Sequence, residues 1–218
     1  MSHVGHRPEI DERTIKLIIG VVALGLAPLT SALSPAPLDS ISAAYHEGGA
    51  AQSVFVGFLF AVAAMLLAYN GRSRREMWLS KIAAVAALGV ALFPCICGTH
   101  AVRVPAAHAV AATIMFLVLA WFCLIFYRRA HAKARRSAQV RAGVYAGCGG
   151  VIVAAIALLG VNQLTSGALQ QVLPRLVFHC EAAALTAFGV SWLNASHVLP
   201  WINHPSERFA PWRDVNPA

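Results

Sequence analysis

Six apolar runs, each long enough to cross a lipid bilayer, constrain the fold of this chain more than any other feature. A transmembrane helix needs about 20 consecutive apolar residues. Backbone groups in lipid must find their hydrogen bonds within the segment, which favours helices. The sequence therefore predicts an all-α polytopic transmembrane bundle, with spans near residues 15–36, 51–70, 80–98, 104–127, 142–162 and 173–194.

The composition agrees with a membrane bundle and leaves no room for a second domain. Hydrophobic residues make up 58% of the chain and charged residues 12%, whereas soluble domains are about 45–50% apolar and about 25% charged. Six spans with short loops use almost all of the 218 residues. We therefore expect one integral membrane domain that covers residues 1–218.

The lysines and arginines are divided very unequally between the two sides of these runs. Of the 17 basic residues, only Arg103 and Arg175 fall on one side, and the remaining 15 fall on the other. Basic loops stay in the cytoplasm when a membrane protein inserts. Both termini are therefore expected in the cytoplasm (N-in, C-in) of a bacterial cell, and residues 37–50, 99–103 and 163–172 outside the inner membrane.

The net charge of +8 also bears on the expected partners. The basic residues form short runs between apolar segments, such as residues 128–136, and do not gather on one polar face. We therefore expect no nucleic-acid partner. The basic loops should attract anionic membrane lipid at about 1 kcal/mol per basic residue, and a second membrane protein is a further candidate partner.

Small residues suggest where the spans pack. Gly143 and Gly147 in the fifth run have the spacing that lets membrane helices approach closely, and Gly150 follows. The cysteines show no evident disulfide pattern. Three of them lie within apolar runs and are interpreted as small packing residues: Cys123, Cys148 and Cys180.

Polar residues concentrate on the predicted outer side. Three of the acids and four of the nine histidines map to this side. The group comprises Asp39, Glu47, Glu181, His46, His100, His108 and His179. The pair Cys95 and Cys97 precedes His100, but this spacing matches neither the common zinc motifs nor haem attachment.

The first outer loop holds three of these polar groups. Asp39 or Ser40 is placed to cap a short helix that Gly48 ends. On such a helix Asp39, Ser42 and His46 stand at i, i+3 and i+7 and share one face. That face combines a carboxylate, a hydroxyl and an imidazole. The alternative is an interfacial helix with a capping acid and a solvated polar side.

His108 and Glu181 stand out among the ionisable residues inside the predicted spans. His108 lies about one turn into the fourth run, and Glu181 lies roughly 12 Å into the sixth at about 1.5 Å per residue. A charge there costs about 2.5–3.5 kcal/mol on insertion scales and indicates a functional site. We expect His46, His108, His179 and Glu181 to converge at the outer surface. The alternative is that Glu181 bonds a neighbouring helix for structural reasons.

Three stretches resemble those of small six-helix bacterial membrane proteins that have no assigned activity. They are residues 40–46 (SISAAYH), 87–95 (ALGVALFPC) and 181–193 (EAAALTAFGVSWL). The resemblance extends from the first outer loop to the last span. It implies a six-helix membrane protein and brings no catalytic residues with it.

A second resemblance is to the seven-helix membrane hydrolases that include alkaline ceramidases and the progestin and adipoQ receptors. These use a Ser-x₃-His motif, an aspartate and a His-x₃-His pair to hold zinc against an amide or ester. Ser42 and His46 match the first motif, and Asp39 stands near it for the acid. The position four residues after His179 is Ala183, so the second pair is incomplete.

Three functions follow from these observations. The first is a zinc-dependent hydrolase of a lipid or amphiphile, with His46, His108 and His179 as metal ligands. Its catalytic groups would be Asp39 or Glu181 as base, supported by Ser42.

The second function is a redox protein in which His108 and His179 ligate one b-type haem and exchange electrons with quinone. No histidine lies in the cytoplasmic half of the spans for a second haem. The third is a non-catalytic accessory protein, or a small transporter that uses Glu181 as a proton or ion site. The sequence favours the third function, without deciding whether the chain is an enzyme, and ranks zinc above haem as a cofactor.

Overall fold

The computed structural model describes residues 11–97 and 104–209, and every regular element within them is a helix. Three elements are short: α2 (Ala44–Glu47), α7 (Ala168–Val172) and the 3₁₀ helix η1 (Pro205–Glu207). Six are long: α1 (Glu12–Leu33), α3 (Gly49–Ala68), α4 (Arg74–Leu92), α5 (Pro105–His131), α6 (Arg136–Leu164) and α8 (Leu176–Ser196).

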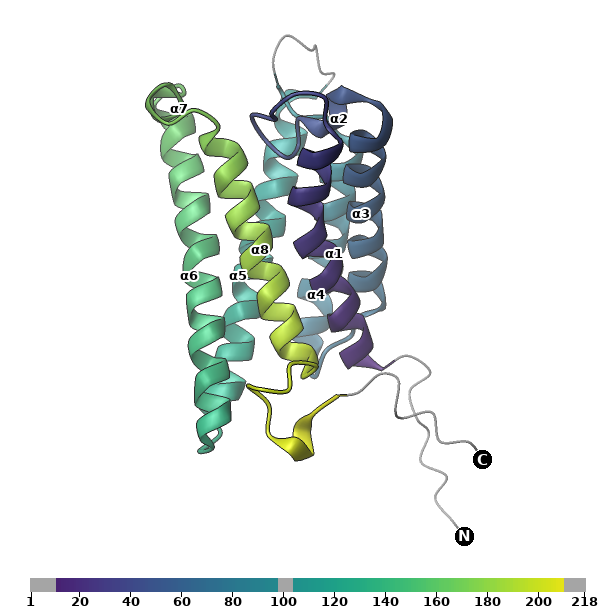
Figure 1. Cartoon of the computed structure of the whole chain (residues 1–218), viewed down its shortest axis with the longest axis vertical. Coiled ribbons are helices and arrows are strands. Elements are labelled where there is room, and N and C mark those ends of the chain that lie inside the picture. Colours follow the sequence, from purple (N-terminus) through teal and green to yellow (C-terminus); the bar gives the residue numbers. More distant parts are fainter. Residues whose placement is uncertain (1–10, 98–103, 210–218) are drawn as a thin grey trace, which may run out of the picture.

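The six long helices form a closed ring and alternate in direction, because the connections between them are short (Figure 1). Around the ring the order is α1, α3, α4, α5, α6 and α8, and α8 packs against α1 again. The start of α1 and the end of α8 consequently lie at the same end of the bundle. The first and last helices of the chain are neighbours.

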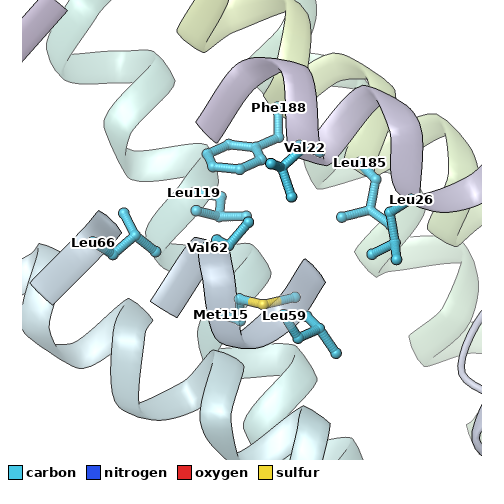
Figure 2. A pocket seen from close by; sticks show the side chains of 10 residues that line it. Val22, Leu26, Leu59, Val62, Leu66, Met115, Leu119, Leu185 and Phe188 are labelled. Carbon is cyan, nitrogen blue, oxygen red and sulfur yellow. The ribbon is translucent and has the colours of Figure 1, made fainter. Parts of the chain in front are cut away.

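Apolar side chains fill the centre of the ring. Figure 2 shows the residues around a small central cavity of about 10 Å³. All of its lining residues are apolar, and they come from α1, α3, α5 and α8: Val22, Ala23, Leu26, Leu59, Val62, Leu66, Met115, Leu119, Leu185 and Phe188. This apolar centre separates the polar groups at the two ends of the bundle.

Five of the six long helices, all except α4, are long and apolar enough to cross a membrane. The chain is therefore a multi-pass membrane protein. α4 differs because it begins with Arg74, Arg75 and Glu76 and also contains Lys81. Its place as a sixth span stays a prediction.

The helices extend past the apolar runs at one end, and α4 shows why. Ser73 caps α4 by accepting a hydrogen bond from the backbone N–H of Glu76 at 3.3 Å, and its hydroxyl donates to the Glu76 carboxylate at 3.0 Å. This pair is a variant of the capping box in which the Ser73 hydroxyl, and not its backbone N–H, donates to the glutamate. It starts the helix six residues before the predicted run at 80, in a charged segment that apolarity alone does not mark.

Glycines bring two helices together, but not those predicted. A Cβ built on Gly143, Gly147 or Gly150 meets no described atom within 4 Å, so the prediction that these residues pack against another helix of the bundle is wrong. Among the described glycines, the contact that brings two helix backbones together is instead between α1 and α8. A Cβ on Gly20 would lie 3.0 Å from the Gly189 carbonyl oxygen, and one on Gly189 would lie 2.9 Å from the Gly20 carbonyl oxygen.

Candidate functional site

The segment between α1 and α3 folds across one end of the helix ring (Figure 1). Leu38, Ile41 and Ala44 of this segment are buried in the same hydrophobic core as the long helices. The segment therefore closes the ring at this end. Its backbone polar groups need partners there, because water does not reach a buried segment.

Two of these partners come from the start of α8. The Arg175 guanidinium donates through Nε to the Leu38 carbonyl at 2.8 Å. The Phe178 backbone N–H donates to the Asp39 carbonyl at 3.0 Å. Arg175 also stacks over the Phe178 ring, with its guanidinium carbon 4.5 Å from the ring centroid. The first turn of α8 is thus joined to the beginning of the segment.

Glu181 provides the third connection, one turn further along α8. Its Oε2 accepts from the Ile41 N–H at 2.6 Å and from the Ser42 N–H at 3.4 Å, and its Oε1 accepts from the Ser42 hydroxyl at 3.3 Å. Both carboxylate oxygens are therefore bonded. We call the contacts of residues 38–42 with Arg175, Phe178 and Glu181 the loop clasp, and this end of the bundle the clasp end.

A second serine extends the hydrogen bonds of the loop clasp. Ser40 Oγ accepts from the Ala43 N–H at 3.0 Å and lies 3.1 Å from Ser42 Oγ. Because the Ser42 hydroxyl donates to Glu181, the Ser40 hydroxyl is the donor to Ser42. The hydroxyls thus form a directed chain that ends at the carboxylate, and each bond polarises the next.

The predicted short helix is only partly present. Ser40 does cap a turn and Gly48, with φ of +71°, ends the helix, but α2 begins at Ala44. A start at Asp39 is wrong because the Asp39 carbonyl accepts from α8 and not from a residue of its own helix. The Asp39 side chain is exposed. Asp39, Ser42 and His46 therefore do not line up on one helical face.

Two of the predicted histidines hold the segment that follows α4. His46 Nε2 lies 2.9 Å from the Cys95 carbonyl oxygen, and His108 Nδ1 lies 2.8 Å from that of Phe93. A carbonyl oxygen only accepts, so both ring nitrogens carry the proton. His108 is buried, as expected for a polar residue within a span. Each imidazole therefore holds the backbone of the segment that follows α4 through a hydrogen bond to a carbonyl.

The third predicted metal ligand does not join them. His179 is exposed and packs edge-on against Phe178, with ring centroids 5.7 Å apart. Within residues 11–97 and 104–209, no group of three or more His, Cys, Asp or Glu residues is placed to hold a metal ion. The zinc set of His46, His108 and His179 is therefore not assembled in the described structure. His100 lies outside the described residues.

Cys95 and Cys97 form a disulfide, which the sequence analysis missed. Their thiols are consequently not available as metal ligands. The other three cysteines are buried and free, as their interpretation as packing residues requires. A close cysteine pair at the predicted outer end of the third apolar run is the signal that would have indicated the disulfide, because extracytoplasmic compartments are oxidising.

The chemistry of the clasp end follows from these partners. A nucleophilic serine needs a base within hydrogen-bond reach to take its proton. The Ser42 hydroxyl donates to a carboxylate that two backbone N–H groups already occupy, and His46 donates to a carbonyl. This network fixes the conformation of a loop.

The chain matches no protein-family model, no curated protein and no solved structure.

Proposed function

We propose that the chain is a non-catalytic accessory protein of the bacterial inner membrane, with six spans and both termini in the cytoplasm. In this proposal the clasp end faces outward, and the loop clasp holds the first outer loop on the last span. The observation that carries it is the bonding of Glu181. Glu181 has the one carboxylate within the predicted outer half of a span, and both of its oxygens accept hydrogen bonds from the loop.

The arrangement of charge supports this topology. Lys16, Arg129 and Arg141 lie at the end opposite the loop clasp, where α1 begins and the α5–α6 connection lies. Arg175 is the one described basic residue at the clasp end. The Cys95–Cys97 disulfide also lies at the clasp end, and disulfides persist in oxidising compartments.

α4 fits a sixth span despite its charges. Arg74 and Arg75 stand in its first turn, where they can reach the interface. Lys81 points back toward the α3–α4 connection, where its ammonium donates to the Tyr69 carbonyl at 3.2 Å and to the Asn70 side chain at 3.1 Å. Trp78, at 62% exposure, is a typical interfacial residue.

The alternatives have less support from the same geometry. A zinc hydrolase needs ligands that converge to about 2.1 Å from one ion, whereas His108 is buried and His179 is exposed. The same two residues would have to ligate a haem. A transporter that uses Glu181 needs a polar route to the other side, and the central cavity has only apolar walls.

Hydrogen exchange tests the proposal directly. We expect the amides of residues 38–44 to be protected in the purified protein, and Glu181→Ala to expose them to exchange. Glu47→Ala, which removes an exposed acid from the same loop, is the matched control and should leave exchange unchanged. The outcome that would refute the proposal is stoichiometric zinc together with amide or ester hydrolysis that Ser42→Ala abolishes.

A further inference from the structure

A pocket with a volume of about 60 Å³ opens at the end of the bundle opposite the loop clasp. Its walls come from α1, α5, α6, the end of α8 with the residue after it, and the α3–α4 and α5–α6 connections. Five of its lining side chains are basic and none is acidic, and His197 joins them. We call it the basic pocket and define it by its cations: Lys16, Arg72, Arg129, Lys133 and Arg141.

Two of these cations are buried and held in place. Arg141 is only 2% exposed; one of its terminal nitrogens donates to the Asn203 side chain at 2.8 Å and the other to Glu207 at 2.8 Å. Lys16 is 6% exposed, and its ammonium lies 3.3 Å from Glu12 and 5.2 Å from the centre of the Tyr69 ring. Burying cations is costly, so the pocket is a built feature and not a flexible surface.

The neighbouring acids do not neutralise the pocket. Glu12 pairs with Lys16, Glu76 pairs with Arg129, and Glu207 is shared between Lys133 and Arg141. Three carboxylates therefore face five cations, which leaves a formal excess of two positive charges among the described residues. Arg72 forms no ion pair within them. An anion with one or two negative charges would complete this balance.

His197 adds a neutral polar group to the wall. Burial beside Arg141 lowers the pKa of His197 to about 4, so the imidazole is uncharged at neutral pH. Its Nδ1 is buried, and no hydrogen-bond partner for it lies within the described structure. An imidazole nitrogen either donates or accepts, depending on the tautomer. The wall of the pocket thus includes a neutral imidazole with one buried nitrogen that has no partner in the described structure.

We infer that the basic pocket binds the phosphate group of an anionic ligand, either a phospholipid headgroup or a free phosphate compound. Guanidinium groups recognise phosphate oxygens with paired, charge-assisted hydrogen bonds. A water molecule needs about 10–15 Å³ of cavity volume. The basic pocket, at about 60 Å³, therefore accommodates a phosphate group while the remainder of the ligand stays outside. The inference does not depend on the role proposed for the loop clasp. With the topology proposed above, the pocket opens to the cytoplasm at the inner leaflet.

Calorimetry on the purified full-length protein can separate the two sources of phosphate. The probes are inorganic pyrophosphate, dihexanoyl phosphatidylglycerol and dihexanoyl phosphatidylcholine, all at one ionic strength in a neutral detergent. Binding of phosphatidylglycerol alone identifies a lipid site, and binding of pyrophosphate alone identifies a site for a soluble ligand. Phosphatidylcholine, which has no net charge, should bind at least about tenfold more weakly than either anion. Absence of binding by both anions overturns the inference.

A pair of double variants tests whether the pocket itself is the site. Arg72→Gln with Lys133→Gln removes two pocket cations, whereas Arg74→Gln with Arg128→Gln removes two exposed arginines that do not line the pocket. At about 1 kcal/mol per basic residue, the first pair should weaken binding about thirtyfold and the second less than about threefold. Equal weakening by the two pairs would mean general surface attraction and would overturn the inference. Ligand-free melting temperatures confirm that both variants fold.

Discussion

Removal of the Glu181 carboxylate is the most direct test of the loop clasp. Ile41 and Ser42 are only 2% and 6% exposed, so their N–H groups do not reach water when the acceptor is lost. An unsatisfied buried donor costs about 1–3 kcal/mol. The Ile41 bond is the short one, at 2.6 Å, and the Ser42 bonds are longer, at 3.3 and 3.4 Å. We therefore expect Glu181→Ala to lower the unfolding free energy by about 3 kcal/mol.

Glu181→Gln separates the loss of charge from the loss of an acceptor. The amide oxygen still accepts from the Ile41 N–H, while the amide nitrogen replaces the oxygen that accepts from the Ser42 hydroxyl. This variant should lose about 1 kcal/mol, because only one side of the carboxyl group is affected. Glu47→Gln, an exposed acid in the same loop, should be neutral.

Thermal unfolding in detergent measures these differences. About 2–4 °C per kcal/mol is typical for a chain of this length, so Glu181→Ala should melt roughly 6–12 °C below the wild type. The order wild type, Gln variant, Ala variant is as informative as the values. If Glu181→Ala melted within about 2 °C of the wild type, the hydrogen bonds of the loop clasp would not hold the loop, and the reasoning would fail.

Three further predictions concern other parts of the molecule. Gly189→Ala should destabilise the bundle by about 1–3 kcal/mol, because its Cβ would meet Leu24 and the α1 backbone. Gly147→Ala is the control in the same melting assay. It should be neutral or slightly stabilising, because its Cβ meets nothing within 4 Å. Burial lowers the pKa of His197 from 6.5 to about 4, so the unfolded chain gains a proton first and stability should fall as the pH drops from 6.5 to 4, by roughly 1–2 kcal/mol because solvent screens part of the effect. His197 has a φ of +63°, which asparagine tolerates, so His197→Asn should flatten that pH dependence. Reporter fusions after residue 136 and at the C-terminus should report cytoplasm and a fusion at residue 48 the outside, and an outward C-terminus would contradict six spans.

The helices could be predicted from the sequence because apolar length and helix formation depend on the same residues. Each predicted run overlaps one long helix. The boundaries differ where charged segments extend a helix, as at Ser73, and where α4 ends at Leu92, before the predicted end of its run at residue 98. The packing faces could not be predicted. The spacing of Gly143 and Gly147 suits close helix contact, but spacing does not indicate whether a face meets a neighbour or the surroundings.

The sequence indicated that Glu181 needs a polar partner at the clasp end, but it did not indicate which groups would be that partner. A carboxylate within a span requires a polar partner, and Glu181 has one in Ser42. Its strongest partner is the Ile41 backbone N–H, 140 residues away, and a backbone donor leaves no mark in residue type. The loop crosses α8 so that Arg175, Phe178 and Glu181 meet it in succession.

The contact between α1 and α8 has a consequence for how the protein is made. A ribosome releases α1 and residues 38–42 long before α8, and Gly20 faces Gly189 only when the last helix has been inserted. Until then the surfaces that α8 will cover have no partner in the chain. In a product that stops after α6, the surfaces of α1 and α6 that α8 covers stay exposed, and the N–H groups of Ile41 and Ser42 lack their acceptor. Membrane proteases recognise exposed, loosely held segments, so such truncated chains should be degraded while full-length chains persist.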